Sequence, residues 1–136
     1  MIPYLKCMLL VAATTGLPPR VLPVIQALEG GRTGMVTPNQ NGTEDLGVMQ
    51  VNSLWLPALA ARAGLSEGET RTRMIMQPCF NIAAAALVLK TYLAETHGAL
   101  LPAIGDYHSH TPVLHDAYLA KAEHTARKLF GPEGTD

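Results

Sequence analysis

The chain has 136 residues, and ten Lys and Arg against eleven Asp and Glu give it a net charge of −1. A hydrophobic fraction of 48% with 15% charged residues excludes a disordered chain, and the lack of a basic surplus argues against a nucleic acid partner. The length fits one domain, and no apolar run approaches the roughly 18 residues that a membrane span requires.

The first predicted helix covers residues 4–15 and ends at Gly16. Lys6 followed by seven apolar residues also resembles a short secretory signal, but no small-residue cleavage site follows. We therefore expect a core helix here, and an export signal that was removed from this chain or was never part of it.

Pro18–Pro19 opens a second helix, whose apolar residues recur at helical spacing and which ends at Gly30–Gly31. Pro23 predicts a late start or a kink, because proline disturbs a helix interior. Residues 31–46 are rich in Gly, Asn, Thr and Pro and predict turns or a short hairpin around Asn41–Gly42.

Five further helices are predicted downstream, at residues 54–63, 67–76, 81–96, 100–106 and 112–129. Ser53 and Ser66 are the expected N-caps of the first two. The segment 81–96 is rich in alanine and apolar almost all round, which is typical of a helix at the centre of a fold. The sequence thus predicts a mainly α chain of six or seven helices with at most a small β-hairpin.

Glu29 is the first candidate for chemistry, because it falls in the last turn of an apolar helix. The negative end of the helix dipole and an apolar surround both disfavour its ionised form. A carboxylic acid that stays protonated near neutral pH can protonate a glycosidic oxygen. A glutamate at a helix end can equally be a plain solvated side chain, so the downstream segment decides between the two.

The segment 47–52, Gly-Val-Met-Gln-Val-Asn, resembles the G-L-M-Q-I-N motif of SLT-type lytic transglycosylases. The wider segment 41–55 is also similar to c-type lysozymes, and in both groups a glutamate that ends a helix precedes the motif. Residues 78–82 and 103–112 supply two further ordered matches. The Tyr-His-Ser-His-Thr-Pro run at 107–112 looks most like small transglycosylases that accompany type III and type IV secretion machines, conjugation systems and pili.

The resemblance implies a lysozyme-like fold with a single domain over residues 1–136. It implies cleavage of the β-1,4 bond between N-acetylmuramic acid and N-acetylglucosamine, with formation of a 1,6-anhydro ring, and a periplasmic or secreted location. Glu29 would be the general acid and then the general base. The chain departs from the family at Gly30, since a serine that contacts substrate or glutamate usually stands there.

The same resemblance implies roles for five residues around the glycan. Gly47 would allow close approach of the sugar, and Met49 and Gln50 would line the groove. Asn52 would brace the motif through hydrogen bonds, and Tyr107 would lie near Glu29 and orient it. Met49 and Tyr107 could also be core residues, and Asn52 could be purely structural.

Asp45 occupies the motif position at which c-type lysozymes carry their second carboxylate, whereas many lytic transglycosylases lack one. In lysozymes that carboxylate works with the acid and supports an oxocarbenium-like transition state. A turn residue that caps its own backbone is the alternative interpretation of Asp45. A hydrolytic lysozyme that uses Glu29 with Asp45, and a non-catalytic murein-binding module, therefore remain rival hypotheses.

No cofactor or metal is expected. His108, His110 and His115 have no standard zinc spacing, and no neighbouring cysteine or carboxylate in the sequence completes a ligand set. The expected partners are peptidoglycan glycan strands and proteins of a secretion, conjugation or pilus machine, and the chain is expected to act as a monomer.

Cys7 and Cys79 are the two cysteines, and their spacing alone does not decide between free thiols and a disulfide. Cys7 lies on the first predicted helix, and Cys79 lies at the start of the central helix against which the first would pack. The secretion-associated members of the resembled family tend to carry cysteines at these places, which implies a Cys7–Cys79 disulfide.

Overall fold

The computed structural model describes residues 2–131, within which seven α-helices, one 3₁₀ helix and three strands form. In chain order these are α1 (Leu5–Thr15), α2 (Val21–Glu29), β1 (Val36–Pro38), β2 (Glu44–Leu46), β3 (Val51–Asn52), η1 (Ser53–Trp55), α3 (Leu56–Ala63), α4 (Glu67–Met76), α5 (Pro78–Glu95), α6 (Leu100–His108) and α7 (Pro112–Phe130). The expected mainly α fold is confirmed, and β3 adds a two-residue strand to the expected hairpin.

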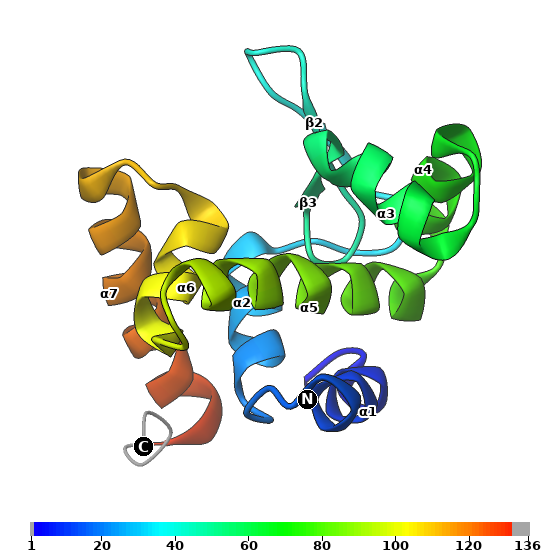
Figure 1. Ribbon diagram of the computed structural model, residues 1–136. Coiled ribbons are helices and arrows are strands. Elements are labelled where there is room, and N and C mark those ends of the chain that lie inside the picture. Colours follow the sequence, from blue (N-terminus) through cyan, green and yellow to red (C-terminus); the bar gives the residue numbers. More distant parts are fainter. Residues whose placement is uncertain (1, 132–136) are drawn as a thin grey trace.

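Helix α5 crosses the middle of the molecule, with the strands, α3 and α4 on one side and α1 on the other (Figure 1). Its buried residues include Ile82, Ala85, Ala86 and Leu89, each fully buried, and the small alanines let α1 and α6 pack closely. Within the described part of the chain, no single helix meets the length and hydropathy that a membrane span needs; α4 and α5 do so only together, as a pair bent by 110°.

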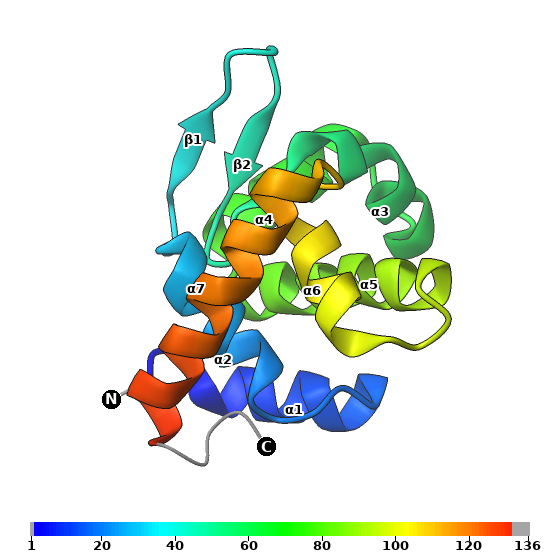
Figure 2. The same ribbon diagram turned by 90° about the vertical axis from the view of Figure 1, so that its left-hand side faces the viewer.

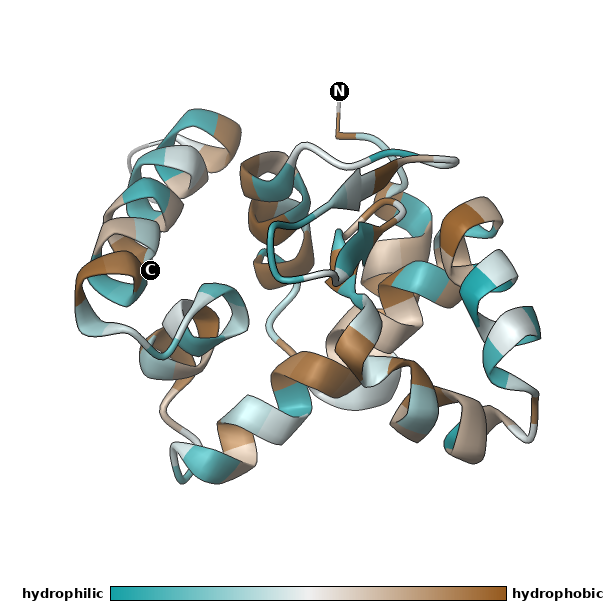
Figure 3. Cartoon of the chain, turned by 90° about the horizontal axis from the view of Figure 1, so that it is seen from above, coloured by the Kyte–Doolittle hydropathy of each residue, from teal (hydrophilic) through white to brown (hydrophobic). Residues whose placement is uncertain are grey.

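Helix α2 begins at Val21, so Pro23 falls in its first turn, where a missing N–H costs little. The helix ends at Gly30, whose left-handed backbone (φ 65°) donates its N–H to the Gln26 carbonyl. Helix α7 packs across α2 (Figure 2) and alternates hydrophilic with hydrophobic residues along its length (Figure 3). The packing of α7 against α2 therefore holds the end of α2 in place.

The strands form an antiparallel sheet in the order β1-β2-β3, and the hairpin of β1 and β2 projects beyond the helices (Figure 2). Its turn contains Asn41 and Gly42 as expected, and Gly42 has the positive φ of 86° that such a turn requires. Asp45 lies on the central strand, paired with Thr37 on β1 and with Asn52 on β3. The sheet thereby fixes Asp45 between two polar neighbours.

The helix expected at residues 54–63 starts as the 3₁₀ helix η1, and its cap differs from the one expected. Asn52, not Ser53, accepts a hydrogen bond from the Leu54 N–H. Ser53 instead accepts the backbone N–H of Glu44 on β2, at 3.0 Å. The expected cap of α4 is confirmed, since Ser66 accepts the Glu69 N–H at 3.1 Å.

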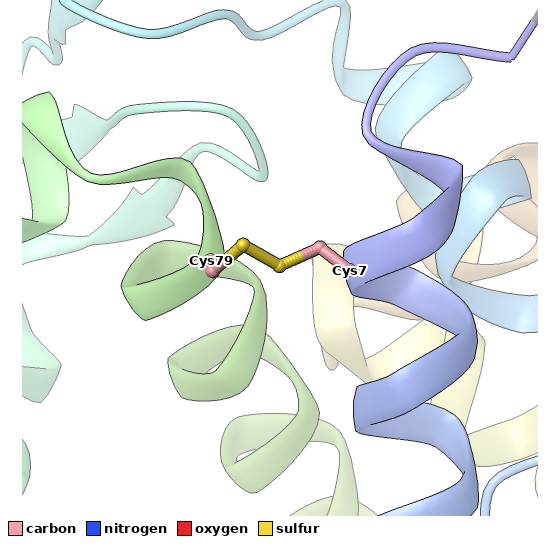
Figure 4. Close-up of a disulfide and its surroundings, with 2 residues drawn as sticks. All are labelled: Cys7 and Cys79. Atoms are coloured by element: carbon pink, nitrogen blue, oxygen red, sulfur yellow. A yellow bond between two sulfur atoms is a disulfide. The ribbon is translucent and has the colours of Figure 1, made fainter.

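A disulfide joins Cys7 on α1 to Cys79 in the first turn of α5, with a Cα–Cα distance of 5.7 Å (Figure 4). The pairing implied by the resemblance is confirmed. Because the bond closes a span of 72 residues, loop-closure reasoning gives it a stabilisation of about 4 kcal/mol. It ties the N-terminal helix to the helix at the centre of the fold.

Candidate active site

A polar cavity of about 430 Å³ lies where the sheet, α5 and α6 meet the end of α2. Most of its lining residues carry a carboxylate, amide, hydroxyl or aromatic ring, which suits a polar ligand such as a sugar. They are Glu29, Asn39, Asn41, Thr43, Asp45, Gln50, Val51, Asn52, Leu54, Trp55, Val88, Tyr92, Asp106, Tyr107, His108, Ser109 and His110.

Glu29 is the last residue of α2 and is partly buried at the cavity wall. Burial is the main cause that raises its pKa, to about 7. The negative charge of Asp45 adds a smaller upward contribution, and a hydrogen bond from Tyr118 opposes both. A large fraction of Glu29 therefore stays protonated near neutral pH, as a general acid requires.

Tyr118 on α7 holds Glu29, donating its hydroxyl to Glu29 Oε1 at 3.1 Å. The phenol is buried, and the His108 ring stacks on it with centroids 4.7 Å apart. Burial first, and then the charge of Glu29, raise the Tyr118 pKa far above its usual value, so the hydroxyl remains a donor. Tyr118 is a positioning residue that the sequence analysis missed. Its only sequence signal is the stripe it forms with Ala122 and Ala126, which is typical of a core face.

Tyr107 was expected to orient Glu29, and the structure corrects this expectation. Its hydroxyl donates to the Met49 carbonyl at 3.0 Å, so it anchors the loop between β2 and β3 instead. Burial, and after it the charges of Glu29 and Asp45, raise the Tyr107 pKa well above the usual value. Tyr107 thus lies near both carboxylates, but the hydrogen bond to Glu29 comes from Tyr118.

Asp45 and Asn52 line the cavity together, and Asn52 Nδ2 donates to Asp45 Oδ1 at 3.2 Å. The same amide nitrogen lies 3.1 Å from the Thr43 hydroxyl. Since Asn52 Oδ1 also caps the Leu54 N–H, the amide joins β2, β3 and η1. The arrangement matches the bracing expected of Asn52, and it brings Asp45 into the same cavity as Glu29.

Gln50 lines the cavity, in a left-handed backbone conformation (φ 51°). Its side-chain oxygen accepts the Thr37 hydroxyl at 2.6 Å, and its amide donates to the Gly47 carbonyl at 3.0 Å. Met49 was expected beside it in the groove, but its side chain is fully buried in the core. Although Met49 and Gln50 are adjacent in the chain, the side chain of Met49 packs in the core and Gln50 lines the cavity.

Gly47 was expected to let the sugar approach, but the space that a side chain there would need is filled by other parts of the protein. Its φ is +69°, and a Cβ there would collide with the Met74 carbonyl and the Asn81 side-chain amide. Asn81, fully buried on α5, donates to the Leu46 and Met74 carbonyls and accepts the Met49 N–H, each at 2.8 Å. Gly47 therefore allows the loop to seat on Asn81, a residue that the sequence analysis assigned only to the start of a buried helix.

Two carboxylates and a histidine meet at the edge of the cavity, and Asp106 and His110 of this group line it. His110 Nε2 lies 3.4 Å from Glu95 Oε2 and 3.7 Å from Asp106 Oδ2, and the three candidate ligand atoms lie within 4.8 Å of one another. Asp106 also contacts His115 Nδ1 at 3.0 Å. Asp106 lies only four residues before His110, so the sequence analysis overlooked a carboxylate close by, whereas Glu95 comes from α5 and joins them only in the fold. Glu95 and His110 are exposed, and the carboxylates form hydrogen bonds with His110 and His115, so the prediction of a metal-free site stays a prediction.

Residues 11–129 match the family model of the transglycosylase SLT domain, so the chain belongs to that family. The resemblance of the motif at 47–52 to SLT-type lytic transglycosylases is thereby confirmed. The chain is also similar to the invasion protein IagB of Salmonella typhimurium, in strains SL1344 and LT2. The identity is 28% over 104 residues, which cover 74% of this chain and 61% of the length of those relatives.

Proposed function

We propose that the chain is a lytic transglycosylase that cuts the β-1,4 bond between N-acetylmuramic acid and N-acetylglucosamine in peptidoglycan. The observation that carries this proposal is Glu29, a carboxyl with a pKa of about 7 in the wall of a polar cavity. The SLT family match supports the substrate class. The lining amides and hydroxyls supply the donors and acceptors that a glycan chain needs.

In the first step, Glu29 gives its proton to the glycosidic oxygen. The C1–O bond then breaks, its electron pair stays on the leaving N-acetylglucosamine hydroxyl, and positive charge develops at C1 of the muramic acid. The carboxylate of Asp45 and the N-acetyl group of the substrate can both support that charge. Tyr118 keeps Glu29 directed at the oxygen through its hydrogen bond.

In the second step, the C6 hydroxyl of the muramic acid attacks C1. Glu29, now a carboxylate, removes the hydroxyl proton and returns to its starting form, and the sugar closes into a 1,6-anhydro ring. No water is consumed. Gln50 and Asn52 would bind the glycan from the sheet side of the cavity, since both line it.

A hydrolytic lysozyme is the second candidate, and the position of Asp45 favours it. Asp45 shares the cavity with Glu29, and its charge acts on the Glu29 carboxyl. A carboxylate in that place could support attack by water in place of the C6 hydroxyl. The two reactions leave different ends on the product, so product analysis separates them.

We further propose that the chain acts as one domain in the periplasm and opens the wall locally for a secretion, conjugation or pilus apparatus. The disulfide supports a location outside the reducing cytosol. The similarity to an invasion protein and the run of residues 107–112 support the apparatus.

The test is mass spectrometry of the muropeptides that the purified chain releases from peptidoglycan sacculi. Anhydromuramic ends are expected, reducing ends would assign the lysozyme reaction, and the Glu29→Gln variant should release neither. If the wild-type chain and Glu29→Gln were equally inactive yet both bound sacculi, a non-catalytic binding module would replace the proposal.

A further inference from the structure

A second cavity, of about 930 Å³, lies over α5 between α1 and α3. These two helices flank α5 on opposite sides (Figure 1) and form the walls, with Leu10 and Val11 from α1 and Ala58 and Leu59 from α3. The floor is one face of α5. We call this second cavity the apolar groove. Its volume is more than twice that of the polar cavity lined by Glu29 and Asp45, which we call the catalytic cavity.

The floor of the apolar groove is a stripe of small or apolar residues. Ala83, Leu87, Thr91 and Ala94 follow one another at spacings of four, four and three, which places them on one helix face. Thr91 and Ala94 are exposed, and Leu10 on the wall is 68% exposed. An open apolar stripe of this kind is typical of an interaction surface.

The apolar groove is also positively charged. Arg62 on α3 and Lys90 on α5 line it, and no aspartate or glutamate does. Both cations are exposed, and neither side chain forms an ion pair or hydrogen bond with another described residue. Since the whole chain carries a net charge of −1, this local positive charge favours an acidic ligand.

Trp55 and Val88 line both the apolar groove and the catalytic cavity. The Trp55 ring also meets Tyr92 edge to face, with centroids 5.8 Å apart, and Tyr92 lines the catalytic cavity. A molecule in the apolar groove would therefore touch a residue that forms a wall of the active site. Trp55 is the only tryptophan in the chain, which makes it a specific reporter.

We propose that the apolar groove docks an amphipathic α-helix of another protein, whose acidic side chains pair with Arg62 and Lys90. A helix fits because the floor stripe runs along α5 for about 17 Å, at 1.5 Å per residue, between two helical walls. The apolar side of the ligand helix would cover that stripe, which is the usual helix-in-groove mode. Apart from Trp55 and Val88, the residues of this surface lie outside the catalytic cavity, and the proposal does not depend on the proposed reaction.

The test uses two synthetic peptides of about 16 residues, long enough to cover the stripe when helical. Both carry the same leucine stripe, flanked by glutamates in one peptide and by lysines in the other. Trp55 fluorescence at low salt reports binding. We expect the glutamate peptide to bind the wild-type chain about tenfold more tightly than the lysine peptide, since two exposed ion pairs differ between the complexes.

Charge reversal locates the site. The double variant Arg62→Glu, Lys90→Glu should reverse the preference and bind the lysine peptide more tightly. The matched control Lys121→Glu, Lys128→Glu changes the net charge by the same amount, at exposed positions of α7. It should keep the wild-type preference. Thr91→Gln places a longer side chain on the floor of the apolar groove and should weaken the binding of both peptides.

Equal binding of the two peptides by the wild-type chain, or an unchanged preference in the Arg62/Lys90 variant, overturns the proposal. A dimer in sedimentation that Thr91→Gln dissociates would assign the apolar groove to a second copy of this chain instead. Binding to anionic lipid vesicles but to neither peptide would assign it to a membrane surface. Because none of these measurements needs cleavage, their outcome is independent of the proposed reaction.

Discussion

The helical wall of the catalytic cavity presents Glu29 through packing, whereas the sheet wall presents Asp45 through hydrogen bonds. Glu29 ends a helix whose residues Val21–Gln26 are all buried, and one tyrosine hydroxyl is its polar contact. Asp45 lies on the middle strand and accepts a hydrogen bond from the amide of Asn52, which also contacts the hydroxyl of Thr43.

In the proposed reaction, this difference between the walls separates two tasks that one carboxyl cannot perform at once. An acid catalyst must keep its proton, and burial in the helical wall provides that by raising the Glu29 pKa to about 7. In the proposed reaction a carboxylate that supports positive charge must instead be held in a fixed position, and the Asn52 hydrogen bond and the strand pairing hold Asp45 in this way. Changes in the two walls should therefore have different consequences.

The largest expected effect is that of Glu29→Gln on turnover. Removing the proton donor should lower the rate of sacculus cleavage by about 10²–10⁴-fold or more, the usual contribution of general acid catalysis. Muropeptide release per unit time measures it. Glu123→Gln, an exposed carboxyl on α7, is the control and should leave the rate unchanged. A Glu29→Gln variant with a rate within tenfold of the wild-type rate would contradict the assignment of Glu29 as the general acid.

Gly47→Ala should damage the sheet wall through stability. The new methyl group would meet the Met74 carbonyl and Asn81 at a backbone φ of +69°, so we expect a loss of about 3 kcal/mol or more in the free energy of unfolding. Gly64→Ala is the matched control, because Gly64 has the same φ but open space around it. Urea unfolding should therefore show a much lower free energy of unfolding for Gly47→Ala than for Gly64→Ala. Equal losses in the two variants would exclude a packing role for Gly47.

Glu29→Gln should also stabilise the fold, by up to about 3 kcal/mol above pH 7. Below the ordinary pKa of 4.5 both states hold the proton, so the carboxyl contributes no difference. Between pH 4.5 and about 7 the unfolded chain ionises first, and the wild-type protein loses stability as the pH rises. Unfolding curves at about pH 4 and about pH 8 measure this gain, which should be present only at the higher pH.

Asp45→Asn should reduce the rate by about tenfold, less than Glu29→Gln, because the N-acetyl group of the substrate can partly replace the carboxylate. Loss of its charge should also lower the Glu29 pKa slightly, since that charge contributes to raising it. Steady-state rates across pH report both effects. Equal losses in Asp45→Asn and Glu29→Gln would instead indicate a lysozyme-like carboxylate pair.

Tyr118→Phe should have the smallest effect, a severalfold loss of rate with a displaced pH profile. The hydroxyl hydrogen bond favours the ionised form of Glu29, so its removal should raise the Glu29 pKa further. The alkaline limb of kcat/KM should then move to higher pH. Tyr107→Phe, which removes a bond to the Met49 carbonyl instead, should leave that limb in place.

Local patterns in the sequence determined the helices, the Asn41–Gly42 turn and the position of Glu29 at a helix end. Each depends on residues a few positions apart, where helical periodicity, prolines and glycines act directly. The motif at 47–52 indicated the family and, with the wider segment 41–55, predicted Asp45, Gln50 and Asn52 as residues of the site; all three line the cavity. These predictions needed no contact between distant parts of the chain.

Only the tertiary structure decided which side chains complete the walls. Tyr118 reaches Glu29 across 89 residues of sequence, and Asn81 holds a loop more than 30 residues earlier in the chain. Met49 and Gln50 are neighbours in the motif, yet one packs in the core and the other lines the cavity. These contacts depend on how α5 and α7 pack against the sheet and α2. The sequence of one helix indicates which of its faces is buried, but the residues that this face contacts are fixed only when the helices pack together.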